Sequence, residues 1–91
     1  AGMDFSGKVV WITGASSGIG AALAREWAAR GSHVVLSGRD QARLAEVAAD
    51  CEARGPDALV LPFDVRDEAA LAGAAAAALG WKGCVDFAVA N

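Results

Sequence analysis

The stretch from Val9 to Gly20 constrains the fold of this chain more than any other. It reads Val-Val-Trp-Ile-Thr-Gly-Ala-Ser-Ser-Gly-Ile-Gly, an apolar and partly β-branched run that passes into a glycine-rich loop. A helical pattern of apolar residues begins directly after the loop. The segment therefore predicts a buried strand, a tight turn and a helix, with Gly14, Gly18 and Gly20 at the turn.

This strand–turn–helix corner is suited to binding an anion. Glycine lets the backbone turn tightly, and a phosphate can approach closely because no Cβ stands in the way. The following helix directs its unpaired N–H groups and the positive end of its dipole toward the same point. A tight turn of this kind can also serve the fold alone, without a ligand.

The glycine spacing distinguishes the loop from two common phosphate-binding motifs. It is Gly-x-x-x-Gly-x-Gly, whereas the common dinucleotide fingerprint is Gly-x-Gly-x-x-Gly and a P-loop ends in Gly-Lys-Ser or Gly-Lys-Thr. With the preceding Thr13, the segment Thr-Gly-Ala-Ser-Ser-Gly-Ile-Gly closely resembles the cofactor loop of the short-chain dehydrogenase/reductase family. The resemblance implies a dinucleotide cofactor whose pyrophosphate meets the backbone N–H groups near Ile19. The cofactor-binding residues expected in the loop are Gly14, Ser16, Ser17, Gly18, Ile19 and Gly20.

Strand and helix patterns alternate along the rest of the chain. Strands are predicted over residues 8–13, 33–37, 58–62 and 85–90, and helices from the glycine loop to Gly31, over 41–54 and over 67–79. Asp40 and Asp67 are the expected N-caps, Gly31 a C-cap and Gly80 a helix breaker.

Three expectations concern particular side chains of these elements. The buried stripe of the first helix is expected to contain Ile19, Ala22, Leu23 and Trp27. Cys51 falls on the apolar face of the second helix, so it is expected to be a core thiol. His33 begins a strand and is interpreted as a solvated strand-end residue rather than a ligand or a base.

Strands that alternate with helices predict a parallel sheet with right-handed crossovers and helices on both faces. The expected fold class is α/β, the first half of a Rossmann-type doubly wound parallel sheet with strand order 3-2-1-4. A ligand then binds above the carboxyl ends of the strands. We expect residues 1–91 to be the N-terminal part of a single NAD(P)-binding domain that is truncated in its fourth strand.

The turn after the second predicted strand bears on the choice of cofactor. A fold of this kind that prefers NAD usually places an acidic residue there, but this chain has Gly38 followed by Arg39. An arginine can bind a 2′-phosphate bidentately and stack on adenine, with the hydroxyl groups of Ser16 and Ser17 as further donors. This favours NADP, and NAD stays the alternative because many NADP-dependent relatives carry a basic residue where this chain has Ser17. Arg39 could instead be a solvated turn residue or cap a neighbouring helix.

Two further motifs match the family after the third and fourth strands. Asp64-Val65 matches an Asp-Val pair that brackets the adenine in the family, although Asp64 taken alone would be interpreted as a cap for the following helix. The final residues Val-Ala-Asn match the start of the family's Asn-Asn-Ala-Gly or Ala-Asn-Ala-Gly segment. This match adds Asn91 to the expected cofactor site.

The resemblance covers the whole chain but assigns no catalytic residue. The family's Tyr-x-x-x-Lys motif and its partner Ser have no match here, because the chain has no Tyr and its lysines are Lys8 and Lys82. Hydride transfer to a carbonyl also requires a group that moves a proton. We therefore expect the 91 residues alone to show no turnover.

Composition narrows the possible partners and locations. A net charge of −3 without a basic block argues against nucleic acid, and no apolar run reaches the length of a membrane span. Cys51 and Cys84 are too few for a disulfide framework or a metal site, which favours reduced thiols in a cytoplasmic protein. Nothing resembles a signal peptide, and Ala1-Gly2 before Met3 is interpreted as a cloning remnant.

These observations lead to one principal functional hypothesis and two alternatives. The principal one is an NADP(H)-dependent oxidoreductase that acts on a small-molecule carbonyl/alcohol pair and, like its relatives, forms a homo-oligomer. The first alternative is a non-catalytic nucleotide-binding or regulatory module. The second, a flavin or other nucleotide fold, is disfavoured by the Thr-Gly-x-x-x-Gly-x-Gly spacing.

Overall fold

The computed structural model describes residues 5–91. Four parallel strands form the central sheet of the fold. The interpretation of Ala1-Gly2 as a cloning remnant lies outside the described residues. The element order is β1 (Val9–Thr13), α1 (Gly18–Ala29), β2 (His33–Ser37), α2 (Gln41–Arg54), β3 (Ala58–Val60), α3 (Glu68–Lys82) and β4 (Phe87–Ala90).

The sheet has the predicted strand order, β3-β2-β1-β4, and every pairing is parallel. Val10 on β1 lies opposite Val34 on β2 and Phe87 on β4. The chain thus moves outward from β1 in one direction to reach β3, and then crosses back to place β4 on the other side of β1. Such a reversal opens a crevice at the carboxyl ends of the strands, where ligands bind in doubly wound folds.

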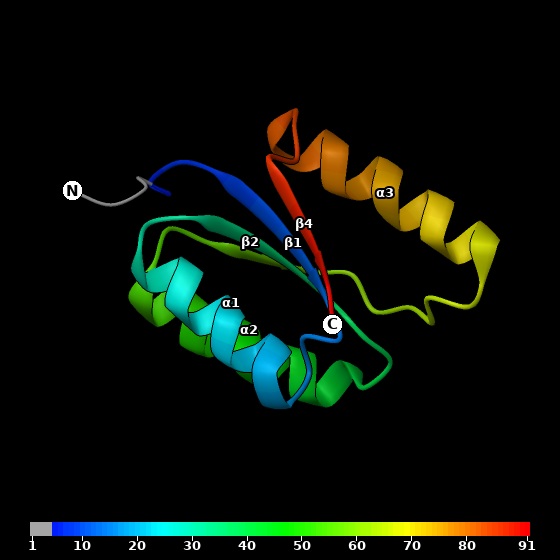
Figure 1. Cartoon of the computed structure of the whole chain (residues 1–91), viewed down its shortest axis with the longest axis horizontal. Helices are drawn as coiled ribbons and strands as arrows, with labels where there is room; N and C mark the ends of the chain where they lie inside the picture. Colours follow the sequence, from blue (N-terminus) through cyan, green and yellow to red (C-terminus); the bar gives the residue numbers. More distant parts are fainter. Residues whose placement is uncertain (1–4) are drawn as a thin grey trace.

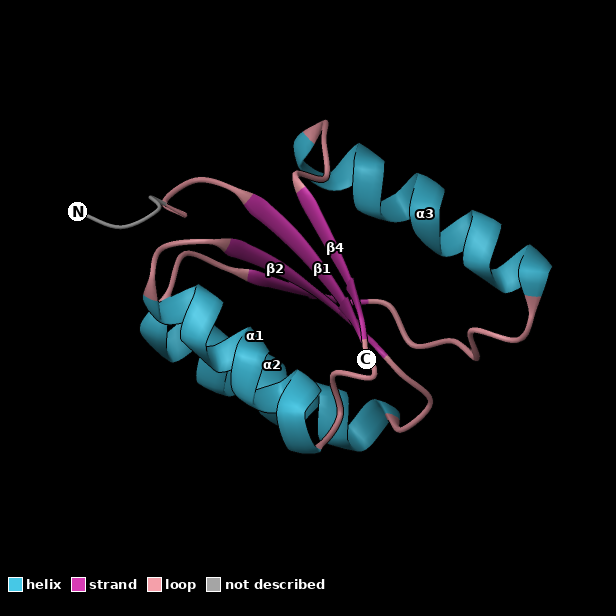
Figure 2. Cartoon of the chain, in the orientation of Figure 1, coloured by secondary structure: helices cyan, strands magenta, loops and turns pink. Residues whose placement is uncertain are grey.

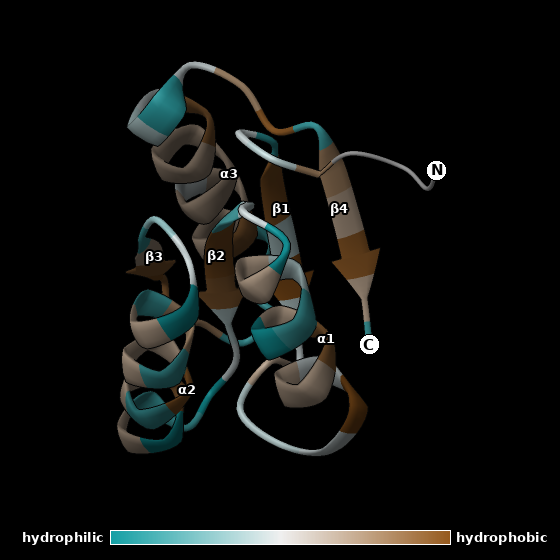
Figure 3. Ribbon diagram, turned by 90° about the vertical axis from the view of Figure 1, so that its left-hand side faces the viewer, coloured by the Kyte–Doolittle hydropathy of each residue, from teal (hydrophilic) through white to brown (hydrophobic). Residues whose placement is uncertain are grey.

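Helices cover both faces of the sheet, as predicted. Helices α1 and α2 lie side by side on one face and α3 lies on the other (Figures 1 and 2). Hydrophobic residues gather on the strands, whereas α2 carries many hydrophilic residues (Figure 3). This three-layer arrangement confirms the α/β class.

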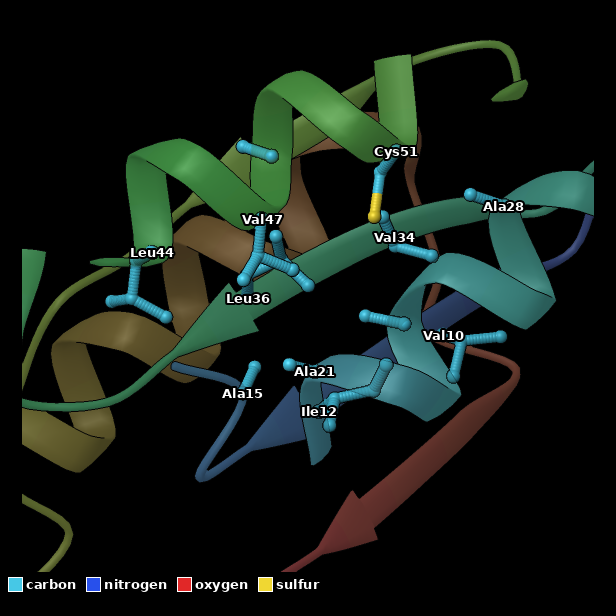
Figure 4. Packing of buried hydrophobic residues seen from close by; sticks show 12 residues of the cluster. Val10, Ile12, Ala15, Ala21, Ala28, Val34, Leu36, Leu44, Val47 and Cys51 are labelled. Atoms are coloured by element: carbon cyan, nitrogen blue, oxygen red, sulfur yellow. The ribbon is translucent and has the colours of Figure 1, made fainter. Parts of the chain in front are cut away.

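The alternation of side chains along β1 and β2 creates two cores. Val10 and Ile12 point into the larger core beneath α1 and α2, while Val9 points toward α3. Figure 4 shows the larger core, in which Leu44, Val47 and Cys51 of α2 face Val34 and Leu36 of β2. Cys51 is fully buried, as expected, and burial raises the pKa of its thiol to about 11.

The buried face of α1 differs from the expected one. Ile19 is 70% exposed and Ala22 is exposed, while Leu23 and Trp27 are only partly buried. The residues that α1 buries are Gly20, Ala21, Ala24 and Ala28. The physical reason is distance: α1 approaches the sheet so closely that small residues fill the contact, and side-chain size does not mark the inner face.

The predicted N-caps are confirmed, but Arg30 rather than Gly31 is the C-cap of α1, with Gly31 following it at φ 92°, and the predicted end of α3 is wrong. Asp40 accepts a hydrogen bond from the backbone N–H of Arg43, and Asp67 accepts one from Ala70, both at 3.1 Å. Helix α3 continues through Gly80 to Lys82 and ends at a left-handed Gly83 with φ 84°. A single glycine within a helix costs only about 1 kcal/mol, which the packing of Trp81 in the core beneath α3 can offset.

The outer strands are shorter than predicted. Strand β3 ends at Val60, although the Leu61 N–H still donates to the Leu36 carbonyl at 2.9 Å. Pro62 has no N–H and cannot extend the pairing. Strand β4 starts at Phe87. The preceding Asp86 still donates its backbone N–H to the Val9 carbonyl at 2.9 Å, but the Val9 N–H donates to the Asp86 carboxylate at 2.8 Å instead of to a backbone carbonyl.

A cluster of charged side chains lies at the amino ends of β2 and β3. The Asp57 carboxylate contacts His33 Nδ1 through one oxygen and Lys82 Nζ through the other, the latter at 2.8 Å. The His33 ring also makes an edge contact with Trp81. The expectation that His33 is a solvated strand end is therefore wrong, because α3 returns to the sheet beside it. The cluster connects the end of α3 to the two strands.

This cluster makes stability dependent on pH in a defined direction. Burial disfavours the charged carboxylate, but hydrogen bonds from Lys82 and His33 outweigh it and hold the pKa of Asp57 below its ordinary value. The contribution of Asp57 to stability is therefore complete above its unfolded-state pKa and is lost as pH falls through the lower folded-state pKa.

We predict that the wild-type protein is more stable than Asp57→Asn at pH 7, and that this difference shrinks as pH falls below about 4. Urea unfolding of both proteins between pH 7 and pH 3 measures it, because only the wild-type protein has a carboxylate at position 57. Lys82→Gln should weaken the same pH dependence while leaving the carboxyl group in place. A difference that is constant over this range would contradict the prediction.

Candidate functional site

A cavity of about 600 Å³ opens at the carboxyl ends of the strands. Loops after all four strands contribute to it, so residues far apart in the sequence meet there. Its lining residues are Thr13, Gly14, Ser16, Gly38, Arg39, Asp40, Phe63, Asp64, Val65, Leu71, Ala90 and Asn91. Six of the expected site residues line the cavity, namely Gly14, Ser16, Arg39, Asp64, Val65 and Asn91, whereas Ser17, Gly18, Ile19 and Gly20 do not.

The glycines of the loop between β1 and α1 serve two different purposes. Gly14 and Gly18 have φ values of 67° and 59°, in the left-handed region that glycine adopts without strain. Gly20 instead permits a close approach, because a Cβ at this position would lie 2.1 Å from the Gly14 carbonyl oxygen. The loop thus folds back on the first turn of α1 and holds that turn at the carboxyl end of β1.

The N-terminus of α1 differs from those of the other two helices. Ser17 occupies the N-cap position of α1 with an extended backbone and makes no side-chain capping bond. Asp40 and Asp67 cap α2 and α3 through their carboxylates. The first turn of α1 also contains no acidic residue. Its backbone N–H groups and helix dipole are therefore suited to an external anion.

Asn91 connects the end of β4 to the glycine loop. Its side-chain Nδ2 donates to the Gly14 carbonyl oxygen at 3.2 Å, and Figure 1 shows the C-terminus beside this loop. A Cβ on Gly14 would lie 2.7 Å from the backbone oxygen of Asn91. Asn91 therefore fixes the shape of the loop at one side of the cavity.

The turn after β2 presents a cation to the cavity. The Arg39 side chain is 72% exposed, and its Nη1 lies 4.0 Å from Asp64 Oδ2. A side chain would fit at Gly38, the residue before Arg39, because a Cβ there would lie 3.5 Å from Ser16 Oγ, an ordinary van der Waals distance. The hydroxyl group of Ser16 and the guanidinium of Arg39 thus flank Gly38 in the same cavity.

Among the described residues, the side-chain hydrogen bonds of Asp64 all come from Arg66. Its Oδ1 accepts the Arg66 backbone N–H at 2.9 Å, and its Oδ2 accepts Arg66 Nη2 at 2.8 Å. The side-chain and backbone hydrogen bonds from Arg66 hold the pKa of Asp64 well below its usual range. The alternative that Asp64 caps α3 is wrong, because Asp67 occupies the N-cap position.

Several lining or supporting residues were not assigned to the site from the sequence. Phe63 packs beside Trp11 with ring centroids 6.3 Å apart, and its N–H donates to the Gly38 carbonyl at 3.0 Å. Leu71 reaches the cavity from the first turns of α3. Asp40 was expected only as a cap, and Arg66 was not considered. The spacing Asp-x-Arg could have indicated Arg66, because it allows an ion pair between neighbouring residues of a turn.

A model of the short chain dehydrogenase family matches residues 8–91. The chain belongs to the short chain dehydrogenase family. A relative named fatty acyl-CoA reductase, from Acinetobacter baylyi, is 48% identical over 64 residues, which are 70% of this chain and 22% of the relative. The family assignment confirms the resemblance carried by the glycine loop.

Solved structures of short chain dehydrogenases have the same fold over nearly the whole chain. A short-chain type dehydrogenase/reductase from Mycobacterium marinum has a TM-score of 0.88 at 35% identity, over 93% of this chain and 34% of that structure. A metagenomic short-chain oxidoreductase in complex with NADP has a TM-score of 0.89 at 37% identity, over 94% and 39%. The chain thus spans well under half the length of these relatives.

Other kinds of site are not formed by the residues that the structure describes. Among residues 5–91, no group of three or more His, Cys, Asp and Glu side chains is placed to hold a metal ion. No helix in the same range is long and apolar enough to span a membrane. Cys51 and Cys84 are both free thiols.

Proposed function

We propose that this short chain dehydrogenase chain is the NADP(H)-binding part of an oxidoreductase that interconverts a small-molecule carbonyl and alcohol. The observation that carries the cofactor preference is the pair Gly38-Arg39 at the cavity, after β2. A carboxylate in place of Gly38 would repel a 2′-phosphate, whereas the exposed guanidinium of Arg39 attracts one. The NADP complex of a similar structure supports this preference.

The cavity and its glycine loop fit a dinucleotide. The uncapped first turn of α1, with Gly18, Ile19 and Gly20, would receive the pyrophosphate through backbone N–H groups. Arg39 and the hydroxyl groups of Ser16 and Ser17 would bind the 2′-phosphate. The adenine would lie between Asp64 and Val65, with Gly14 and Asn91 shaping the loop below it.

The cofactor supplies the hydride chemistry, and these residues hold it in place. We assign no proton-transfer group within the 91 residues, because the chain contains no Tyr. We propose that residues 1–91 form the N-terminal part of a single dinucleotide-binding domain, which agrees with the 34% and 39% of the two solved structures that they cover. Homo-oligomerisation is proposed by analogy with the family.

We predict that Arg39→Ala in the full-length protein weakens NADPH binding by roughly 1.5–3 kcal/mol, the range of a charge-assisted hydrogen bond. NADH binding should change little, because NADH has no 2′-phosphate. Isothermal titration calorimetry with both cofactors measures the two effects. Arg30→Ala is the matched control, since Arg30 is also exposed but pairs with Glu26 at the far end of α1. Equal losses for NADPH and NADH would show that Arg39 acts on the fold or on the adenine alone.

A further inference from the structure

Arg66 lies outside the cavity lining, yet it controls the charge nearest to Arg39. Three of its N–H groups, the backbone N–H, Nε and Nη2, donate to the two oxygens of Asp64 at 2.8 to 3.2 Å. An ionised carboxylate offers about four acceptor positions. Arg66 therefore takes up most of the acceptor capacity of Asp64, with two hydrogen bonds to each carboxylate oxygen.

Two arginines thus compete for one carboxylate. Arg39 Nη1 stands 4.0 Å from Asp64 Oδ2, at the limit of an ion pair, while Arg66 Nη2 holds the same oxygen at 2.8 Å. A bidentate arginine–carboxylate pair is among the strong interactions of this type. Because Arg66 already neutralises Asp64, the carboxylate attracts the Arg39 guanidinium only weakly. The Arg39 side chain stays 72% exposed.

We infer that Arg66 is a positioning residue for cofactor selection: by occupying Asp64, it keeps Arg39 available to the 2′-phosphate of NADP(H). The inference rests on the proposed function and deepens it. In the absence of Arg66, Asp64 becomes an unpaired anion whose nearest cation is Arg39. The two would then pair, and the cavity would lose the cation that recognises the 2′-phosphate.

Adenosine 2′,5′-bisphosphate and 5′-AMP test this inference without the nicotinamide half of the cofactor, because they differ only in the 2′-phosphate. Calorimetry on the full-length protein gives the ratio of their affinities. We expect Arg66→Ala to reduce the preference for the bisphosphate about tenfold, as the loss of one charge-assisted hydrogen bond does. Arg66→Lys should give a smaller reduction, because an ammonium keeps the charge but cannot form the bidentate pair.

A double-mutant cycle separates this effect from a structural one. Asp64→Asn removes the charge that would capture Arg39, so adding Arg66→Ala to Asp64→Asn should leave the affinity ratio unchanged. Arg30→Ala is again the control for loss of one exposed positive charge. Thermal unfolding of each variant reports whether the protein is folded, which we expect because the Arg66 side chain is 76% exposed.

Three outcomes would overturn the inference. If Arg66→Ala weakens both ligands by the same factor, Arg66 acts on the adenine site or the fold. If its effect on the ratio persists in the Asp64→Asn background, Arg66 contacts the 2′-phosphate directly. If the wild-type protein shows no preference for the bisphosphate, the proposed NADP preference is itself wrong and the inference falls with it.

Discussion

Gly20→Ala should destabilise the protein by about 3 kcal/mol or more and remove dinucleotide binding. The added Cβ would lie 2.1 Å from the Gly14 carbonyl oxygen and 2.9 Å from Asn91 Nδ2. The first contact is with backbone, which cannot move aside without displacing either the glycine loop or the start of α1. Urea unfolding measures the loss of stability, and calorimetry with NADPH measures the loss of binding.

Gly73 and Gly80 provide matched controls for this substitution. Both lie in α3, and a Cβ at either position would meet nothing within 4 Å. Alanine there should stabilise the protein by up to about 1 kcal/mol, because alanine has the higher helix propensity. If Gly20→Ala behaves like Gly80→Ala, the close approach of α1 to the loop does not exist in solution.

Local sequence patterns were sufficient for most of the fold. The bounds of β2 and α2 follow from apolar periodicity together with Asp40 as an N-cap, and the structure has them where the sequence predicts them. The alternation of strands and helices indicated a doubly wound nucleotide-binding fold, and the strand order 3-2-1-4 was expected from that fold. These features depend on local propensities and on general topology, which a single sequence contains.

Features that depend on contacts between distant segments were not predictable in this way. The inner face of α1 is set by its close packing against the sheet, which selects Ala21 and Ala24 rather than the larger Ile19. His33 gains a partner because Asp57 and the end of α3 meet at the amino ends of the strands. Such contacts between distant segments leave no periodic pattern in the sequence of a single helix or strand.

The candidate site was predictable wherever it depended on the ends of strands. Parallel strands bring their carboxyl ends to one edge, so Gly14, Arg39, Asp64 and Asn91 meet in one cavity although they are distant in sequence. Arg66 was missed because it acts through another side chain rather than from the cavity wall. Supporting interactions of this kind need side-chain geometry, which motifs do not encode.

Gly38→Asp should reverse the cofactor preference of the full-length protein. A carboxylate at this position would enter the cavity beside Ser16 and Arg39, where we propose that the 2′-phosphate binds. Repulsion between the two anions, together with pairing of the new carboxylate with Arg39, should weaken NADPH binding by about 2–4 kcal/mol. NADH should bind more tightly by about 1 kcal/mol, because the carboxylate can accept hydrogen bonds from its ribose hydroxyl groups.

Gly38→Ala separates the effect of charge from that of size. The Cβ lies 3.5 Å from Ser16 Oγ and 3.6 Å from Leu44 Cδ2, which are ordinary contact distances, and Gly38 is not among the glycines with positive φ. Alanine should therefore leave both affinities nearly unchanged, while aspartate changes them in opposite directions. Calorimetric titration of each variant with NADPH and NADH decides the matter: parallel losses for both cofactors in Gly38→Asp would mean that the carboxylate disturbs the turn after β2, and that the 2′-phosphate does not bind beside it.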